Sequence, residues 1–461
     1  MHVLLISCYD LGHQPFALAS ASAHLLKRGH RVECMDLAVQ EFDREKVLKA
    51  DLIGISIPMH TAMCLGIKAG ERIKAIKPGI HLCYFGLYAS LNEQDLLSNV
   101  GDAVIGGEFE GPLADYIDGL ETGDLNSLGV SLDQCLRKPN LSRQEFVTPV
   151  RSLLPPLEDY SKLMIPGHGE KLVGSTQTSR GCAHRCRHCP IPSVYEGRLR
   201  LVQEQVVLDD IDNLVEMGAE HISFGDPDFL NGVKYSLGIV RAMNDKHSDL
   251  SFDITAKVEH LLEYPEVLCE LGSLGCLFVI SAVETVDDRI LEYLDKGHTR
   301  NDVIVALQNT RKAGIHLKPS LLPFTPWTTM SGYLDLLDFI EEHDLIYHVD
   351  PVHYSIRLLL PPRSKLLGIS ELSAVVGEMS KEDLVYEWKH PDARVDELQK
   401  RIALIVESSI ENEEDSPTIF ARIKAVARGR EASFLEAVTE ADDFFLPVES
   451  RPPAFSESWF C

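Results

Sequence analysis

Hydrophobic residues in the first part of the chain alternate between short unbroken runs and longer stretches with helical spacing. The unbroken runs, typical of strands buried on both faces, are Val3–Ser7, Val32–Met35, Leu52–Ile57, His81–Phe85 and Ala103–Ile105. Helical stretches such as Phe16–Arg28 and Ala62–Ile76 lie between them, and glycine or proline follows each. The pattern predicts a doubly wound parallel sheet, a Rossmann-like α/β domain, over residues 1–120.

A second alternation of strands and helices begins at Leu172. The predicted strands are Leu172–Thr178, His221–Phe224, Leu250–Thr255, Cys276–Ser281, His316–Leu322 and Tyr347–Ile356. Six such strands, with helices such as Gln203–Met217 between them, predict a partial (βα)6 TIM-like barrel over residues 171–362. The active site of such a barrel lies at the carboxyl ends of its strands.

Two further segments continue neither alternation. Prolines and glycines interrupt every regular pattern in residues 121–170, which are therefore predicted to be a linker. In residues 363–461, helical spacing occurs at Lys381–Trp388, Val395–Ile410 and Thr418–Arg428. We expect a helical C-terminal region that ends in a tail.

Charge and composition narrow the function. The 461 residues include 44 basic and 70 acidic side chains, for a formal charge of −26, so we expect no nucleic-acid partner. No run reaches the roughly 18 apolar residues of a membrane-spanning helix, and Met1–Ser7 lacks the basic flank of a signal peptide. We expect a cytoplasmic protein without a membrane partner. Its 11 cysteines then indicate a metal cluster or reactive thiols and not disulfides.

Three of these cysteines, Cys182, Cys186 and Cys189, have the spacing C-x3-C-x2-C directly after the first strand of the second alternation. Cysteine thiolates hold iron–sulfur clusters, and a [4Fe-4S] cubane takes four protein ligands when it is closed. Three ligands leave one iron open to a small molecule. A structural zinc site, with His184 or His188 as its fourth ligand, is the alternative.

The spacing and position of this loop resemble the radical S-adenosylmethionine (SAM) superfamily. The resemblance implies that the open iron binds SAM, and that an electron donor such as flavodoxin or ferredoxin reduces the cluster. It also implies that Gly225 and Asp226 approach the SAM amino group and that Glu284 accepts hydrogen bonds from the SAM ribose. Lys257 is either a partner of the SAM carboxylate or a solvated lysine. Arg357 is either a carboxylate clamp or part of a structural ion pair.

The strand ends of residues 1–120 also suggest a cofactor site. Ligands of doubly wound sheets bind at the carboxyl ends of the strands, which here carry Cys8–Gln14, Ser56–Thr61, Gly86–Ser90 and Gly106–Gly111. The sequences Phe85–Ser90 and Ile105–Glu110 resemble the cobalamin-binding domain of one radical SAM class, which implies a pocket wide enough for a corrin facing the barrel. The cobalt-ligating pattern D-x-H-x-x-G is absent, because His13 has the wrong spacing. The alternative is a scaffold without cofactor.

The chain finishes on Trp459-Phe460-Cys461, two aromatic residues and a thiol that would be unusual at an exposed end. It resembles a cobalamin-domain radical SAM family with a cysteine- or selenocysteine-bearing tail, although it stops at its single cysteine. Enzymes that form arsinothricin look like relatives. The resemblance implies that Cys461 is catalytic and captures a soft acceptor such as trivalent arsenic. An incidental cysteine is the alternative.

Together with these observations, the resemblance implies an oxygen-sensitive radical SAM transferase with a small-molecule substrate. It would cleave SAM reductively and transfer a methyl or a 3-amino-3-carboxypropyl group. One alternative is a cobalamin-dependent radical SAM C-methyltransferase of natural-product biosynthesis. A non-enzymatic cobalamin or metal carrier is an alternative of another class, and it predicts no SAM contacts at the strand ends.

Overall fold

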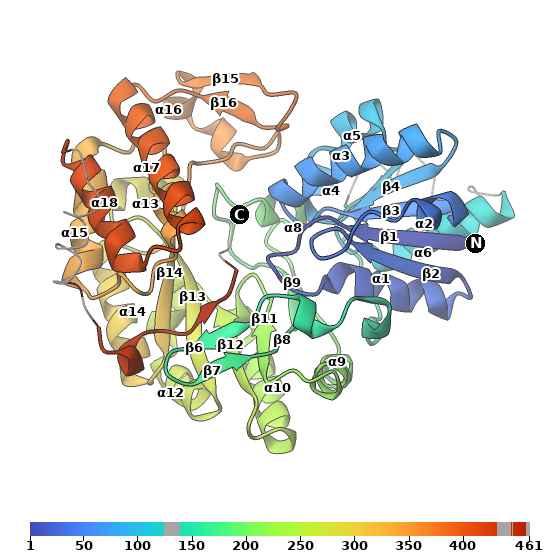
Figure 1. The fold of residues 1–461 in the computed structure, drawn as a ribbon, viewed down its shortest axis with the longest axis horizontal. Coiled ribbons are helices and arrows are strands. Elements are labelled where there is room, and N and C mark those ends of the chain that lie inside the picture. The colour runs from blue at the N-terminus through green and yellow to red at the C-terminus, as the bar shows by residue number, and fades with distance from the viewer. Residues whose placement is uncertain (124–138, 431–443, 445, 458–461) are drawn as a thin grey trace.

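The amino-terminal sheet is parallel, with the strand order β2-β1-β3-β4-β5 (Figure 1). The computed structural model describes residues 1–123, 139–430, 444 and 446–457. The strands are β1 (His2–Ser7), β2 (Arg31–Asp36), β3 (Leu52–Ser56), β4 (His81–Phe85) and β5 (Ala103–Ile105). All five strands predicted for residues 1–120 are therefore confirmed within one or two residues at their ends.

Helices cover both faces of this sheet, which explains why its strands are apolar throughout. They are α1 (Phe16–Lys27), α2 (Arg44–Lys49), α3 (His60–Ile76), α4 (Leu87–Leu91), α5 (Glu93–Asn99) and α6 (Glu110–Thr122). Alternate residues of β1 belong to different cores: Leu4 and Ile6 pack with the α3 side, and Val3 and Leu5 with α1 and α6.

The second sheet is also parallel, with the order β14-β13-β12-β11-β8. Its strands are β8 (Val173–Thr176), β11 (His221–Phe224), β12 (Ser251–Thr255), β13 (Cys276–Glu284) and β14 (His316–Leu321). The accompanying helices are α9 (Glu204–Glu216), α10 (Val233–Lys246), α11 (Val258–Glu263), α12 (Pro265–Ser273), α13 (Asp288–Leu294), α14 (Arg300–Lys312) and α15 (Met330–Glu342). The partial barrel is thus confirmed over its first five strands.

The sixth strand, predicted at Tyr347–Ile356, is wrong. Pro351 begins a short 3₁₀ turn, Pro351–Tyr354, in the middle of this run. A proline has no N–H for a strand ladder and favours the start of a helical turn, so the apolar run cannot continue as a strand. A single bridge between Phe324 and Arg357 takes the place of the sixth strand.

The C-terminal region is only partly helical. Helices α17 (Ala393–Glu411) and α18 (Ser416–Ala427) confirm two predictions, and a short helix α16 (Ser370–Ser373) precedes them. The helix predicted at Lys381–Trp388 is wrong, because its end is β16 (Tyr386–Trp388), which pairs with β15 (Val376–Met379). The indole of Trp388 donates to the carbonyl of Leu358, a contact distant in sequence that overrides the local pattern.

The predicted linker contains strands that pair with the end of the chain. Strand β6 (Leu163–Ile165) lies between β7 (Gly169–Lys171) and β17 (Ala454–Phe455). The ring of Phe455 packs against Phe278 near the amino end of β13, with ring centroids 5.8 Å apart, and against His13. The loop after β1 is therefore held near the amino ends of the barrel strands, away from their carboxyl ends.

Candidate active site

The three-cysteine loop connects β9 (Ser179–Gly181) to the short helix α8 (Ile191–Tyr195). Strand β9 pairs with β10 (Leu199–Leu201), which follows the helix, so the loop is closed at its base. Gly181 has φ +72°, and a Cβ there would lie 2.2 Å from the carbonyl oxygen of Arg198. Only glycine fits this close approach, which explains the glycine directly before the first cysteine.

The thiols of this loop lie in a partly buried, cation-containing environment. Cys182 and Cys186 are buried and Cys189 is half-buried. Burial raises the pKa of Cys182, and it raises the pKa of Cys189 to about 12, although the nearby Lys296 ammonium acts in the opposite direction on Cys189. Asn231 Nδ2 donates to Cys182 Sγ at 3.4 Å. Such thiols become thiolates on binding a metal centre, and the donors around the sulfurs fit an anionic cluster.

Neither histidine of the loop faces the thiols as a zinc ligand would. His188 Nε2 lies 3.0 Å from Glu284 Oε1, and His184 Nε2 lies 3.4 Å from Asp228 Oδ2. In the described part of the chain, the groups of metal-ligating atoms that lie within 4.8 Å of one another do not include the three sulfurs. Tetrahedral zinc, with Zn–S of about 2.3 Å, needs a more compact group. The structure disfavours the zinc alternative.

Glu284 ends β13 and faces the loop. It has φ +65°, a conformation rarely adopted by non-glycine residues, and the register between β13 and β14 shifts next to it. Its carboxylate accepts from His188 and, at 3.1 Å, from the buried Lys296. Burial alone would raise the pKa of Glu284, but Lys296 and His188 hold that pKa well below its usual range. Backbone strain and a fixed charge at a barrel strand end are typical of a functional site.

Gly225 and Asp226 follow β11 but have different surroundings. Gly225 lines a cavity, whereas the carboxylate of Asp226 accepts from the amide and hydroxyl of Thr178 at 2.9 and 2.7 Å. Asp226 also accepts from the hydroxyl of Ser179. The predicted contact between this side chain and SAM is therefore corrected: Asp226 holds the chain that leads into the cysteine loop.

Lys257 lies in a group of charged side chains at the ends of β11 and β12. Its ammonium contacts the carboxylate of Glu259 and lies 3.3 Å from His184 Nδ1. Asp228, whose side chain is fully buried, is 2.9 Å from His260 Nδ1. The prediction that Lys257 is at the site is consistent with this position, and the solvated alternative is wrong because Lys257 is 9% exposed. The fold reveals that His184, Asp228 and His260 lie together here.

Arg357 does not reach the site. Its guanidinium donates to Asp396 Oδ1 on α17 and to the carbonyl of Trp388, both at 2.7 Å, and stacks 3.5 Å from the centroid of the Trp388 ring. These contacts attach the C-terminal region to the barrel. These contacts support the structural alternative, and a cofactor contact of Arg357 stays a prediction.

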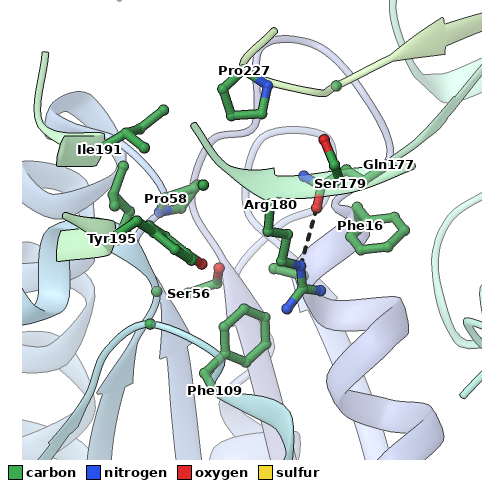
Figure 2. Close-up of a pocket in the computed structure, with 16 residues that line it drawn as sticks. Phe16, Ser56, Pro58, Phe109, Gln177, Ser179, Arg180, Ile191, Tyr195 and Pro227 are labelled. Carbon is green, nitrogen blue, oxygen red and sulfur yellow. Dashed lines mark hydrogen bonds between the residues drawn. The ribbon is translucent and has the colours of Figure 1, made fainter. Parts of the chain in front are cut away.

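A cavity lies between the two sheets, beside the cysteine loop (Figure 2). It encloses about 230 Å³, within about 790 Å³ of open space that is continuous with solvent. Figure 2 shows Ser56, Pro58 and Phe109 of the amino-terminal unit facing residues of the barrel unit. The barrel unit contributes Gln177, Ser179, Arg180, Gly181, Ile191, Tyr195, Gly225 and Pro227. The loops after β3, β4 and β5 line the cavity as predicted, but Cys8–Gln14 does not.

Arg180, which lines this cavity, also links the two units. Its guanidinium forms a bidentate pair with Glu110, at 2.8 Å through Nη1, and lies 3.5 Å from Glu108. Both carboxylates are fully buried, and burial raises the pKa of Glu108 although Arg180 acts against it. The pair fixes the amino-terminal sheet against the strand that leads into the cysteine loop. Arg180 stands two residues before Cys182 in the sequence.

Comparison with known proteins identifies the barrel. The sequence profile of the radical SAM superfamily matches residues 176–340. The chain contains a radical SAM domain. An uncharacterized methyltransferase of Pyrococcus horikoshii is 24% identical over 338 residues, which cover 70% of this chain and 72% of the relative. The radical SAM assignment makes the chain an enzyme that uses a [4Fe-4S] cluster and SAM.

Solved structures share the fold of both units. The cobalamin-dependent radical SAM enzyme OxsB, with aqua-cobalamin bound, superposes with a TM-score of 0.71 at 15% identity, covering 96% of this chain and 72% of OxsB. The radical SAM methyltransferase TsrM of Kitasatospora setae superposes with a TM-score of 0.66 at 15% identity, covering 96% and 98% of the two chains. These likenesses confirm the α/β architecture: an amino-terminal parallel sheet followed by a partial barrel.

Two sequence predictions stand apart from this radical SAM site. Cys461 lies outside the described residues, so its catalytic role stays a prediction. Glu457, the last described residue, is near the loop after β1, because its amide donates to Ser161 and its carboxylate lies against Gly12. None of the described helices is both long and apolar enough to cross a bilayer.

Proposed function

We propose that this enzyme is a cobalamin-dependent radical SAM methyltransferase acting on a small molecule. The observation that carries the proposal is the cavity at the joint between the two units. The ends of β3, β4 and β5 form one wall, and the approach to the cysteine loop forms the other. A cofactor at those strand ends would face a SAM molecule held at the barrel, as methyl transfer between the two requires.

The cavity lining fits a corrin held without a protein ligand to cobalt. Among the described residues that line it, none is a histidine. His13 packs against Phe455 near the amino ends of the barrel strands, and His60 Nε2 lies 2.8 Å from the carbonyl oxygen of Asp383. The enclosed volume is below the roughly 300–1,000 Å³ of small-molecule sites, so a corrin would extend into the part open to solvent. Cobalamin, when bound there, supplies a methyl carrier.

The residues at the barrel mouth have distinct proposed roles toward SAM. The cluster, when held by Cys182, Cys186 and Cys189, supplies an electron and an open iron for SAM. Glu284 offers acceptor oxygens to ribose hydroxyls, because its low pKa keeps it ionised. Lys257 offers a cation for a carboxylate.

The proposal also concerns which group is transferred and which molecule accepts it. Methyl transfer is supported by the methyltransferase names of the Pyrococcus relative and of TsrM, and it replaces 3-amino-3-carboxypropyl transfer as the favoured outcome. The described part of the chain offers no support for trivalent arsenic as acceptor, and that acceptor stays a prediction tied to Cys461. The cytoplasmic location also stays a prediction. The carrier alternative is disfavoured, because a radical SAM domain is an enzyme domain.

Cobalamin binding tests the proposal. We expect the anaerobically reconstituted protein to retain one hydroxocobalamin per chain, read from its visible spectrum after gel filtration. Leu87→Trp, which fills the cavity wall at the start of α4, should lower retention at least tenfold. Leu65→Trp places the same ring at an exposed position of α3 and should leave retention unchanged. Equal retention by both variants, or none by the parent protein, would contradict the proposal.

A further inference from the structure

The rim of the cysteine loop carries a concave basic surface on an otherwise acidic chain. The concavity measures about 670 Å³, within about 1080 Å³ that is open to solvent. It is lined by Arg185, Arg198, Arg363 and Lys365, with Glu196 as the acidic side chain among its lining residues. Over the whole chain the ratio is reversed, with 44 basic against 70 acidic residues. A local excess of positive charge of this kind selects an anionic partner.

This basic surface, defined as Arg185, Arg198, Arg363 and Lys365, is directly connected to the cluster ligands. Arg185 precedes Cys186, so their Cα atoms are about 3.8 Å apart. Its guanidinium donates to the carbonyl of Glu196 at 3.3 Å, which fixes the loop against the end of α8. A partner that docks here therefore lies closer to the cluster than one that docks on the outer helices of either unit.

Two chain segments build the surface as a fixed unit. The hydroxyl of Ser193 in α8 donates to the carbonyl of Arg363 at 2.8 Å, which joins the helix after the cysteine loop to the segment after the barrel. Arg198 and Arg363 are exposed and only loosely paired, each 3.6 Å from a carboxylate. In the described part of the chain, Arg185 and Lys365 have no carboxylate within 4.0 Å, and both are exposed. The positive charge is available to a partner.

We propose that the basic surface docks an acidic one-electron carrier protein that reduces the cluster. The inference rests on the radical SAM reaction, which needs an electron from outside the enzyme. The reaction itself does not specify where the electron donor docks. In the docked complex one electron passes from the reduced carrier to the cluster, so the carrier is oxidised and the cluster reduced by one electron each. No bond is made or broken at the surface. Complementary charge raises the association rate and makes it sensitive to salt.

The test compares a protein reductant with a chemical one. The variant is Arg198→Glu/Lys365→Glu, in which both substituted residues lie outside the cluster loop. An acidic flavodoxin serves as the protein reductant. We expect its dissociation constant, measured by calorimetry at low salt, to rise at least tenfold, and turnover of SAM driven by reduced flavodoxin to fall in parallel. Turnover driven by dithionite, which needs no docking, should stay within twofold of the parent enzyme.

A matched variant separates a local surface from net charge. Lys68→Glu/Lys312→Glu makes the same change in charge at exposed lysines on α3 and α14, and flavodoxin affinity should not change. An equal loss of affinity in both double variants, or unchanged binding in Arg198→Glu/Lys365→Glu, would overturn the proposal. Equal losses with flavodoxin and dithionite would also overturn it, because the surface would then act on SAM or an anionic substrate. These measurements of flavodoxin affinity and SAM turnover do not depend on cobalamin, so they remain valid if cobalamin does not bind.

Discussion

His188 of the cysteine loop and Glu284 at the end of β13 are joined by a 3.0 Å contact between Nε2 and Oε1. The second partner of Glu284 is Lys296, whose side chain is 3% exposed. The contact therefore places a buried ion pair directly behind the cluster ligands. It orients a carboxylate toward the space where the proposed function puts SAM.

Replacing Glu284 separates its structural role from its ligand role. Glu284→Gln leaves the Lys296 ammonium buried without its counter-charge, so the free energy of unfolding should fall by roughly 3–5 kcal/mol in urea denaturation. SAM binding should also weaken, by on the order of 1–3 kcal/mol, because the amide offers one acceptor oxygen in place of two.

The double variant Glu284→Gln/Lys296→Met removes the uncompensated charge and should recover most of the lost stability. Calorimetry with SAM then decides the role of the carboxylate. If the double variant binds SAM as tightly as the parent enzyme, Glu284 is a structural residue only.

Removing the three cluster ligands should abolish iron binding without unfolding the chain. Cys182→Ala/Cys186→Ala/Cys189→Ala should contain no [4Fe-4S] cluster by iron analysis and should not cleave SAM reductively, because alanine offers no ligand. Cys64→Ala/Cys269→Ala is the control, since these thiols lie outside the loop and are not fully buried. SAM cleavage by the triple variant would contradict the assignment of the cluster.

The amino-terminal unit should lose stability as the pH rises through the titration of Asp36. Burial raises the pKa of Asp36 from 3.8 to about 6, although Tyr160 and the amide of Ala38 donate to its carboxylate. The folded state binds the proton more tightly than the unfolded state, so this contribution is complete below about pH 4 and is lost by about pH 6. The loss is on the order of 3 kcal/mol.

Asp36→Asn is neutral throughout this range, and the Tyr160 hydroxyl can accept from the new amide. Urea denaturation of the cluster-free protein at pH 4–7 should therefore show a smaller decrease for the variant than for the parent chain. Parallel curves for the two proteins would show that Asp36 keeps an ordinary pKa.

The catalytic role of Cys461 is a prediction from the sequence alone. Cys461→Ser should abolish formation of the methylated or otherwise modified product, while SAM cleavage continues uncoupled, because a hydroxyl is a poorer nucleophile and soft-metal ligand than a thiolate. If the acceptor is a trivalent arsenic compound, its binding should weaken as well. Ser456→Ala, five residues earlier, is the control. Full product formation by Cys461→Ser would end the role of the tail.

The sequence by itself determined the two parallel sheets, and it also predicts the cluster ligands. Unbroken apolar runs such as His81–Phe85 and His221–Phe224 became strands with the predicted bounds, because burial on both faces leaves a local signal that needs no partner to be recognised. Cys182, Cys186 and Cys189 were equally visible, since their ligand geometry is contained within a single loop.

Only the tertiary structure decided which of the remaining candidates face the site. Asp226 follows a strand as Glu284 does, and Arg357 lies at a single bridge. Asp226 is hydrogen-bonded to Thr178 and Arg357 to Asp396, partners that are 48 and 39 residues away. Lys296 and His260 became candidates only in the fold, where Lys296 contacts Glu284 and His260 contacts Asp228. The interaction energy of a side chain depends on neighbours in space, which a pattern along one chain does not specify. The same reason made Tyr386–Trp388 a strand, since it pairs with Val376–Met379 and Trp388 donates to the carbonyl of Leu358, both outside the predicted helix.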